Sequence, residues 1–177
     1  MEIDSSKKDF LVNEFLMFSL NAGLQTRSYP VYLYYSNEGI QLKHDIKKYL
    51  IQYTQNFENT TEGYHYRKIV EMSDLISETY KKILINGRFR IGVSQKVMNL
   101  FLKYMWTAGY IKMPFHCPFD SIIKSKLIKE SNHTILTDWT MLDSIEEYKK
   151  YVTMASIKAA KMNLTIAEWE LVSWNRR

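Results

Sequence analysis

Apolar residues recur at helical spacing along almost the whole chain, and only six glycines and three prolines interrupt this pattern in 177 residues. Repeats and low-complexity tracts are absent from the sequence. The periodicity therefore predicts an all-α fold. Because the length suits one compact unit with a sizeable core, we expect residues 1–177 to form a single helical domain.

The breaks in the pattern divide the chain into predicted helices. The first covers residues 6–21, with Gly23 as its stop, whereas residues 29–35 (YPVYLYY) are aromatic and β-branched enough to be extended. Further helices are predicted at residues 39–57, 63–72, from 73 or 74 to the Asn86-Gly87 turn, 97–106, 120–130, 144–162 and from Thr165 onward. Thr165 opens a Thr-x-x-Glu capping box with Glu168.

Charge and cysteine content limit the partners, cofactors and cellular location that the sequence predicts. The chain has 24 Lys and Arg against 19 Asp and Glu, and its net charge of +5 suits a polyanionic partner without requiring one. A single cysteine, Cys117, excludes an internal disulfide and a four-cysteine iron–sulfur cluster, which favours a cytoplasmic location. No apolar run approaches 18 residues, and the start MEIDSSKKDF has no signal-peptide core, so no membrane association is expected.

The most informative stretch is residues 91–125, IGVSQKVMNLFLKYMWTAGYIKMPFHCPFDSIIKS. Lys96 follows a glycine-containing turn in the first turn of a helix, and Asp120 follows Pro118-Phe119, where a carboxylate caps the next helix. The helix at residues 97–106 is apolar nearly all round and belongs at the centre of the protein. Its polar exceptions, Lys96, Asn99 and Lys103, share one face, which predicts that they line a cleft.

These residues resemble the helix-hairpin-helix DNA glycosylases, in particular the bifunctional branch related to 8-oxoguanine DNA glycosylase. The family pattern is a hairpin, a catalytic lysine, an apolar helix and a Pro-hydrophobic-Asp motif that opens another helix. Ile91-Gly92-Val93-Ser94-Gln95-Lys96 is similar to the hairpin and lysine, and Pro118-Phe119-Asp120 is similar to the aspartate motif. The motif occupies about residues 88–126, and the resemblance implies a minimal version of the family's helical domain.

The resemblance implies a chemistry and two catalytic residues. Lys96 would attack the sugar C1′ and form a Schiff base, while Asp120 would stabilise the sugar cation as the base leaves or help to activate the lysine. The expected activity is excision of an oxidised or modified purine from double-stranded DNA, followed by strand nicking.

The resemblance also implies binding residues. The hairpin would hold a DNA phosphate through backbone N–H groups, and its carbonyls are a candidate site for a monovalent cation, with no organic cofactor required. The candidate DNA contacts are Gly92, Ser94, Gln95 and Lys124. The candidate base-pocket residues are Asn99, Lys103 and His116, although a hydrogen-bonded structural role is the simpler interpretation of His116. No metal site is predicted, since the adjacent His116 and Cys117 lack further ligands.

Two other interpretations stay open. The chain can be a binding module that recognises nucleic acid, a nucleotide or a protein on a glycosylase-like fold without catalysis, which its short length and the serine in place of a second hairpin glycine both favour. It can also be a protein-interaction domain from a phage or bacterial defence system that uses its aromatic surface. No specific protein partner follows from the sequence.

Overall fold

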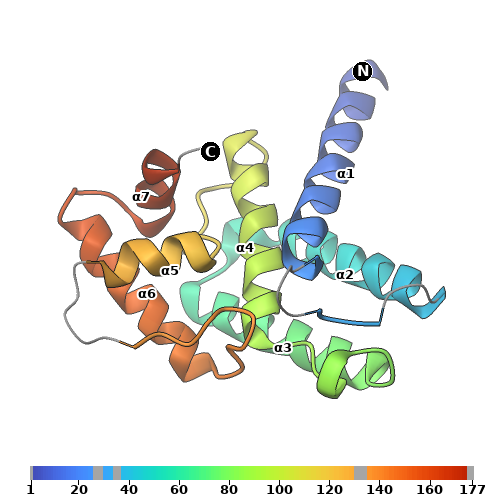
Figure 1. Cartoon of the computed structure of the whole chain (residues 1–177). Helices are drawn as coiled ribbons and strands as arrows, with labels where there is room; N and C mark the ends of the chain where they lie inside the picture. Colours follow the sequence, from blue (N-terminus) through green and yellow to red (C-terminus); the bar gives the residue numbers. More distant parts are fainter. Residues whose placement is uncertain (1, 26–29, 34–36, 130–134, 175–177) are drawn as a thin grey trace.

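The computed structural model describes residues 2–25, 30–33, 37–129 and 135–174. These residues form an all-helical protein, as predicted (Figure 1). Seven α-helices and two short 3-10 helices follow one another in the described residues: α1 (Glu2–Leu24), α2 (Asn37–Gln55), η1 (Phe57–Asn59), α3 (Glu62–Tyr80), η2 (Ile85–Gly87), α4 (Ile91–Thr107), α5 (Ser121–Ile128), α6 (Ile145–Ala160) and α7 (Ile166–Ser173). None of these helices is long and apolar enough to cross a membrane.

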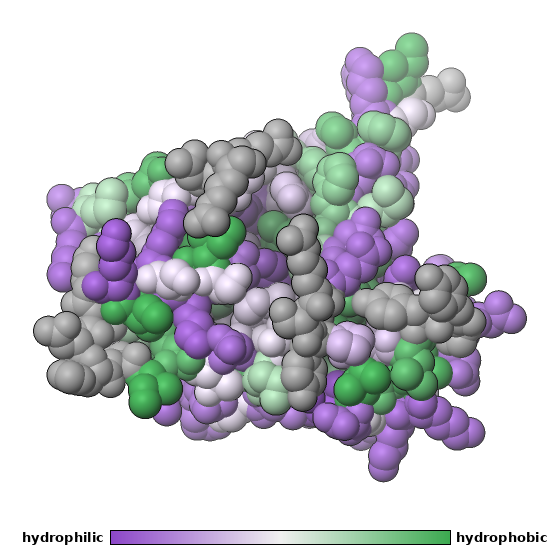
Figure 2. All heavy atoms as spheres, viewed as in Figure 1, coloured by the Kyte–Doolittle hydropathy of each residue, from purple (hydrophilic) through white to green (hydrophobic). Residues whose placement is uncertain are grey.

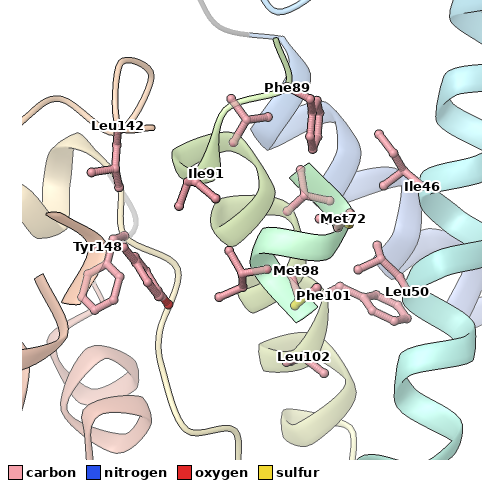
Figure 3. Packing of buried hydrophobic residues seen from close by; sticks show 14 of the residues in the cluster. Ile46, Leu50, Met72, Phe89, Ile91, Met98, Phe101, Leu102, Leu142 and Tyr148 are labelled. Atoms are coloured by element: carbon pink, nitrogen blue, oxygen red, sulfur yellow. The ribbon is translucent and has the colours of Figure 1, made fainter. Parts of the chain in front are cut away.

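Helix α4 is the centre of the protein, which confirms the prediction for residues 97–106. It packs against α1 and α3 and also contacts α2 and α6, and nearly every residue in its first three turns is buried. Figure 3 shows Met98 and Phe101 of α4 gathered with Leu50 of α2, while Leu142 and Tyr148 lie on the other side of α4. The apolar residues on all faces of α4 thus pack against helices on several sides.

Helix α1 begins four residues earlier than predicted, and it continues through Gly23 to Leu24. A Cβ atom at Gly23 would lie 2.2 Å from Cγ2 of Val97, so the glycine lets α1 approach α4 closely. Gly23, which was predicted to end the helix, is therefore the point where α1 contacts α4.

The predicted extended segment is present in its described part. The Leu33 N–H donates to the Ile83 carbonyl at 2.7 Å, and the Ile85 N–H donates to the Val31 carbonyl at 3.0 Å. This short antiparallel pairing joins the link between α1 and α2 to the end of the α3 region. Positions 29, 34 and 35 of the predicted segment lie outside the described residues.

Helix α3 is one continuous helix, and the predicted break near Ser73 is wrong. The Ser73 hydroxyl donates to the Phe89 carbonyl at 2.5 Å, and the Ser77 hydroxyl accepts the Phe89 N–H at 2.9 Å. Both serines are buried and bind the returning chain, so neither caps a helix. The predicted Asn86-Gly87 turn exists, with φ of 56° and 65°, but α3 ends before it.

The predicted turn at residues 91–95 is also wrong, because these residues are the first turns of α4. The three C-terminal helices begin where the sequence indicates: Asp120, Ser144 and Thr165 each cap a helix with their side chains, and Thr165 forms the capping box with Glu168. Helix α5 ends at Ile128 and α6 at Ala160, slightly earlier than predicted.

Candidate functional site

Lys96 and Asp120 meet at one cleft, which Lys96 was predicted to line. The Lys96 ammonium donates to Oδ2 of Asp120 at 2.6 Å, and both side chains line a cleft of about 180 Å³. The lysine side chain is 9% exposed and the aspartate side chain 23% exposed. The pair is thus mostly enclosed by protein.

Asp120 divides its two oxygens between two tasks. Oδ1 accepts the N–H groups of Ile122 and Ile123, both at 3.0 Å, and this caps α5. Oδ2 is left for Lys96. Because the helix cap fixes the rotamer, the carboxylate is held in position before any ligand arrives.

Polar side chains of α4 hold the segment that precedes Asp120. The Gln95 amide pairs with the Phe119 backbone, donating to its carbonyl at 2.7 Å and accepting its N–H at 3.1 Å. Asn99 donates to the Cys117 carbonyl at 3.1 Å. Gln95 and Asn99 are therefore buried positioning groups inside the protein, and Asn99 does not line the cleft as predicted.

The start of α4 is covered by the chain that follows α5. Gly92 is buried, its N–H donates to the Leu142 carbonyl at 2.8 Å, and a Cβ there would lie 1.7 Å from the Trp139 carbonyl oxygen. Ser94 is buried as well, and its hydroxyl donates to the Ile69 carbonyl. The N–H groups that were expected to hold a DNA phosphate are thus enclosed. The turn that was a candidate cation site is helical instead.

A protein carboxylate occupies the N-terminus of α4. Oδ1 of Asp143 accepts the Ile91 N–H at 3.2 Å, and both carboxylate oxygens accept from Nε of Arg88 at 3.0 Å. A helix N-terminus attracts an anion, and here the anion is supplied by the chain itself.

A second ion pair forms another wall of the cleft. Nζ of Lys103 lies 2.6 Å from Oε2 of Glu170 on α7, as a charge pairing without the geometry of a directed hydrogen bond. The Trp174 ring lies 5.4 Å from the Lys103 ammonium. Lys103 therefore lines the cleft as predicted, whereas Glu170 and Trp174 were not found from the sequence, because no local pattern marks them.

His116 belongs to a buried hydrogen-bonded network and not to the cleft. The network contains six side chains, in order: Tyr53, His65, Asn99, Tyr148, His116 and Glu62. Each neighbouring pair is joined by one contact of 2.8 to 2.9 Å. His65, to which the sequence assigned no role, is fully buried between Tyr53 and Asn99.

Burial sets the charge of both network histidines. It lowers the pKa of His65 to about 3, with the nearby His116 adding to the shift, and it lowers the pKa of His116 against the opposing effect of Glu62. The hydrogen bond from His116 lowers the pKa of Glu62. Both imidazoles are thus neutral at pH 7 and act as structural connectors.

The remaining predicted residues lie outside the cleft. Lys124 on α5 pairs with Asp138 at 2.7 Å, while Lys126, two residues later, lines the cleft. Burial raises the pKa of the Cys117 thiol, which makes it a poor nucleophile. Among the described residues, no cluster of three or more His, Cys, Asp or Glu side chains is suited to a metal ion.

Comparison with known protein families, with curated proteins and with solved structures gave no match. The interpretation of the cleft therefore depends on its geometry. A primary amine within hydrogen-bond distance of a fixed carboxylate is suited to proton transfer between the two groups and to attack on an electrophilic carbon. Three lysines and two carboxylates line the cleft: Lys96, Lys103 and Lys126 against Asp120 and Glu170. This net positive charge is compatible with an anionic ligand.

Proposed function

We propose that this protein removes a damaged or modified base from double-stranded DNA and then nicks the strand, as a bifunctional DNA glycosylase with AP-lyase activity. The observation that carries the proposal is the Lys96–Asp120 pair, with its 2.6 Å contact at the wall of a cleft. The ordered motif that resembles the 8-oxoguanine glycosylase branch suggests an oxidised purine as the base.

The two residues have separate tasks in this reaction. Lys96 loses a proton to solvent, and its neutral amine then attacks C1′ of the sugar while the bond to the base breaks and the base leaves with a proton from solvent. The adduct nitrogen then loses a proton and O4′ gains one as the C1′–O4′ bond breaks, which opens the sugar ring and leaves a protonated imine between Lys96 and C1′. Loss of the C2′ proton and of the 3′-phosphate then breaks the strand. The fixed Asp120 carboxylate stabilises the positive charge that develops on the sugar.

A borohydride trap tests the chemistry directly. Borohydride reduces a lysine imine to a stable amine, so incubation with duplex DNA that contains 8-oxoguanine or an abasic site should give a covalent protein–DNA adduct. Lys96→Gln should abolish the adduct, because an amide cannot form the imine. The matched control is Lys48→Gln, which removes an exposed lysine of α2 outside the cleft and should leave trapping intact.

Asp120→Asn tests the second task. Asparagine caps a helix about as well as aspartate, so the melting temperature should change little. Base excision should slow by roughly 10²–10³-fold, the usual loss when one electrostatic contact at a reacting centre is removed. Parent-like rates in folded Lys96 and Asp120 variants would reject the catalytic proposal.

A second candidate function is a binding module without catalysis. The occupied N-terminus of α4 favours it, because Asp143 lies where a DNA phosphate would be needed and Gly92 and Ser94 are enclosed. Salt-dependent retention of lesion DNA without an adduct would support this module. A failure to retain any DNA would leave the protein-interaction domain as the better explanation.

A further inference from the structure

The N-terminal half of α1 projects from the body of the protein (Figure 1). Every residue from 3 to 11 is exposed, and buried residues begin only at Leu16. Isolated helices shorter than about 12–15 residues are marginal in water. This half of α1 therefore gains little from its own chain and would gain much from a partner.

Apolar side chains form a stripe on the outer face of α1. Its members are between 37% and 70% exposed: Ile3, Phe10, Leu11, Met17 and Phe18. Their positions repeat every seven residues, which places them on one side of a helix, opposite the buried Leu16 and Leu20. Figure 2 shows apolar side chains among the charged ones on this projecting helix. Helix α1 is thus apolar on two faces; its own protein covers one and touches the other at Phe18, whose ring lies 6.2 Å from the Tyr104 ring of α4.

Two charges on the same stripe indicate what covers it. Lys7 is four residues after Ile3, and Glu14 is four residues after Phe10, so both lie among the apolar side chains. If two copies of α1 pack antiparallel about a two-fold axis between residues 10 and 11, residue i lies opposite residue 21 − i. Lys7 of each copy then lies opposite Glu14 of the other.

The same register pairs the apolar residues. Ile3 lies opposite Phe18, and Phe10 lies opposite Leu11, so one axis matches both charges and four of the five apolar side chains, while Met17 lies opposite Asp4 at the edge of the stripe. We propose that the outer face of α1 is a homodimer interface, formed by antiparallel packing of α1 against α1 of a second copy. A two-fold interface requires such a self-complementary surface.

The charge pattern distinguishes a second copy from a lipid surface. Helices that lie on membranes carry basic residues on their polar face and keep acidic residues out of the apolar stripe. Here Glu14 is inside the stripe, and Asp4 and Asp9 are also on the projecting half. A lipid surface would leave Glu14 without an opposite charge, whereas a second copy supplies Lys7.

The expected dimer is weak. The pairing uses residues 3–18, a length of about 24 Å, which is a small contact surface for a protein dimer. We expect a dissociation constant on the order of micromolar. Sedimentation equilibrium from about 1 µM to several hundred µM should then follow the change from the 21.1 kDa monomer to a species of twice that mass.

Charge reversal tests the register as well as the surface. Lys7→Glu alone and Glu14→Lys alone each place like charges opposite one another at two symmetric positions, and each should weaken self-association on the order of tenfold. An equal mixture of the two variants should recover the association as a heterodimer, because every pair is then of opposite charge. The matched control is Asp9→Lys, a charge reversal on the other side of the helix, which should have no such effect.

Circular dichroism verifies that each variant keeps its helix content. Phe10→Ser should remove association, because it places a polar group at the centre of the stripe. A protein that stays monomeric throughout the concentration range overturns the proposal. The proposal is also overturned if neither charge reversal weakens the dimer, or if mixing the two reversal variants does not restore association. Binding of the monomer to anionic vesicles would identify a lipid surface as the occupant instead.

Discussion

The buried network around His65 shows how single side chains determine protonation states. Nε2 of His65 donates to Oδ1 of Asn99, and Nδ1 accepts from the Tyr53 hydroxyl, which requires one neutral tautomer. Likewise the Tyr148 hydroxyl donates to Nδ1 of His116. These contacts use neutral imidazoles, so a proton added to Nδ1 of either ring would require the tyrosine hydroxyl to turn from donor to acceptor inside the protein. This arrangement couples folding to pH.

We predict that the protein loses stability as the pH falls below about 6.5. The pKa values of His65 and His116 are lower in the folded protein than the ordinary value of 6.5, so below pH 6.5 the unfolded chain binds protons that the folded protein does not. For His65 this continues down to about pH 3. Each histidine should contribute about 1.4 kcal/mol per pH unit to the loss within its window. Urea denaturation at pH 4.5 to 7.5 measures the slope.

Substitutions distinguish the contribution of the buried histidines to the pH dependence of stability from that of other titrating groups. His65→Asn should lower the free energy of unfolding at pH 7 but also reduce its slope with pH, since one of the two linked protons is gone. His44→Asn, on the exposed surface of α2, should leave the slope unchanged. An equal slope in all three proteins would show that His65 does not contribute to the acid sensitivity.

Among elements, the contact between α1 and α4 depends on Gly23. We predict that Gly23→Ala destabilises the protein by about 1–3 kcal/mol, because the new methyl group would overlap the Val97 side chain in a packed interface. Gly63→Ala in α3 meets no atom within 4 Å and should be neutral or stabilising by up to about 1 kcal/mol. Chemical denaturation measures the free energy of unfolding of both variants. Helix propensity alone would raise it in both, so a loss in Gly23→Ala alone indicates the packing effect.

Helix starts were predictable from the sequence where one side chain makes the cap. Asp120 and Thr165 act within three residues of their own position, so the sequence contains the whole interaction. Ser73, Gly23 and Gly92 indicated breaks or turns, yet each lies inside a helix. Their partners, Phe89, Val97 and the Trp139 carbonyl, come from other elements. Local propensity was overridden there by tertiary contacts that no local pattern reveals.

At the scale of the whole molecule, the candidate site was predictable only in part. Lys96 and Asp120 are joined by one helix and a returning segment, so a motif of 25 residues was enough to place them together. Asp143 closes the start of α4 from 52 residues away, and Glu170 reaches Lys103 from the last helix. Contacts at such separations depend on the complete fold. The sequence therefore predicted the Lys96–Asp120 pair but not the groups that surround it.

The Lys103–Glu170 pair joins the central helix to the C-terminal one, and its removal tests how far the cleft depends on this link. Both side chains are at most 11% exposed, so breaking the pair leaves a buried charge without its partner. Lys103→Met and Glu170→Met should each cost about 3–5 kcal/mol, whereas the double substitution should cost much less than their sum, because it removes both charges from the interior. A double-mutant cycle in urea measures this coupling, and the exposed Lys124–Asp138 pair is the control, with an expected coupling below about 1 kcal/mol. Additive losses at Lys103 and Glu170 would mean that water reaches the pair in solution and that α7 is held by its apolar contacts alone.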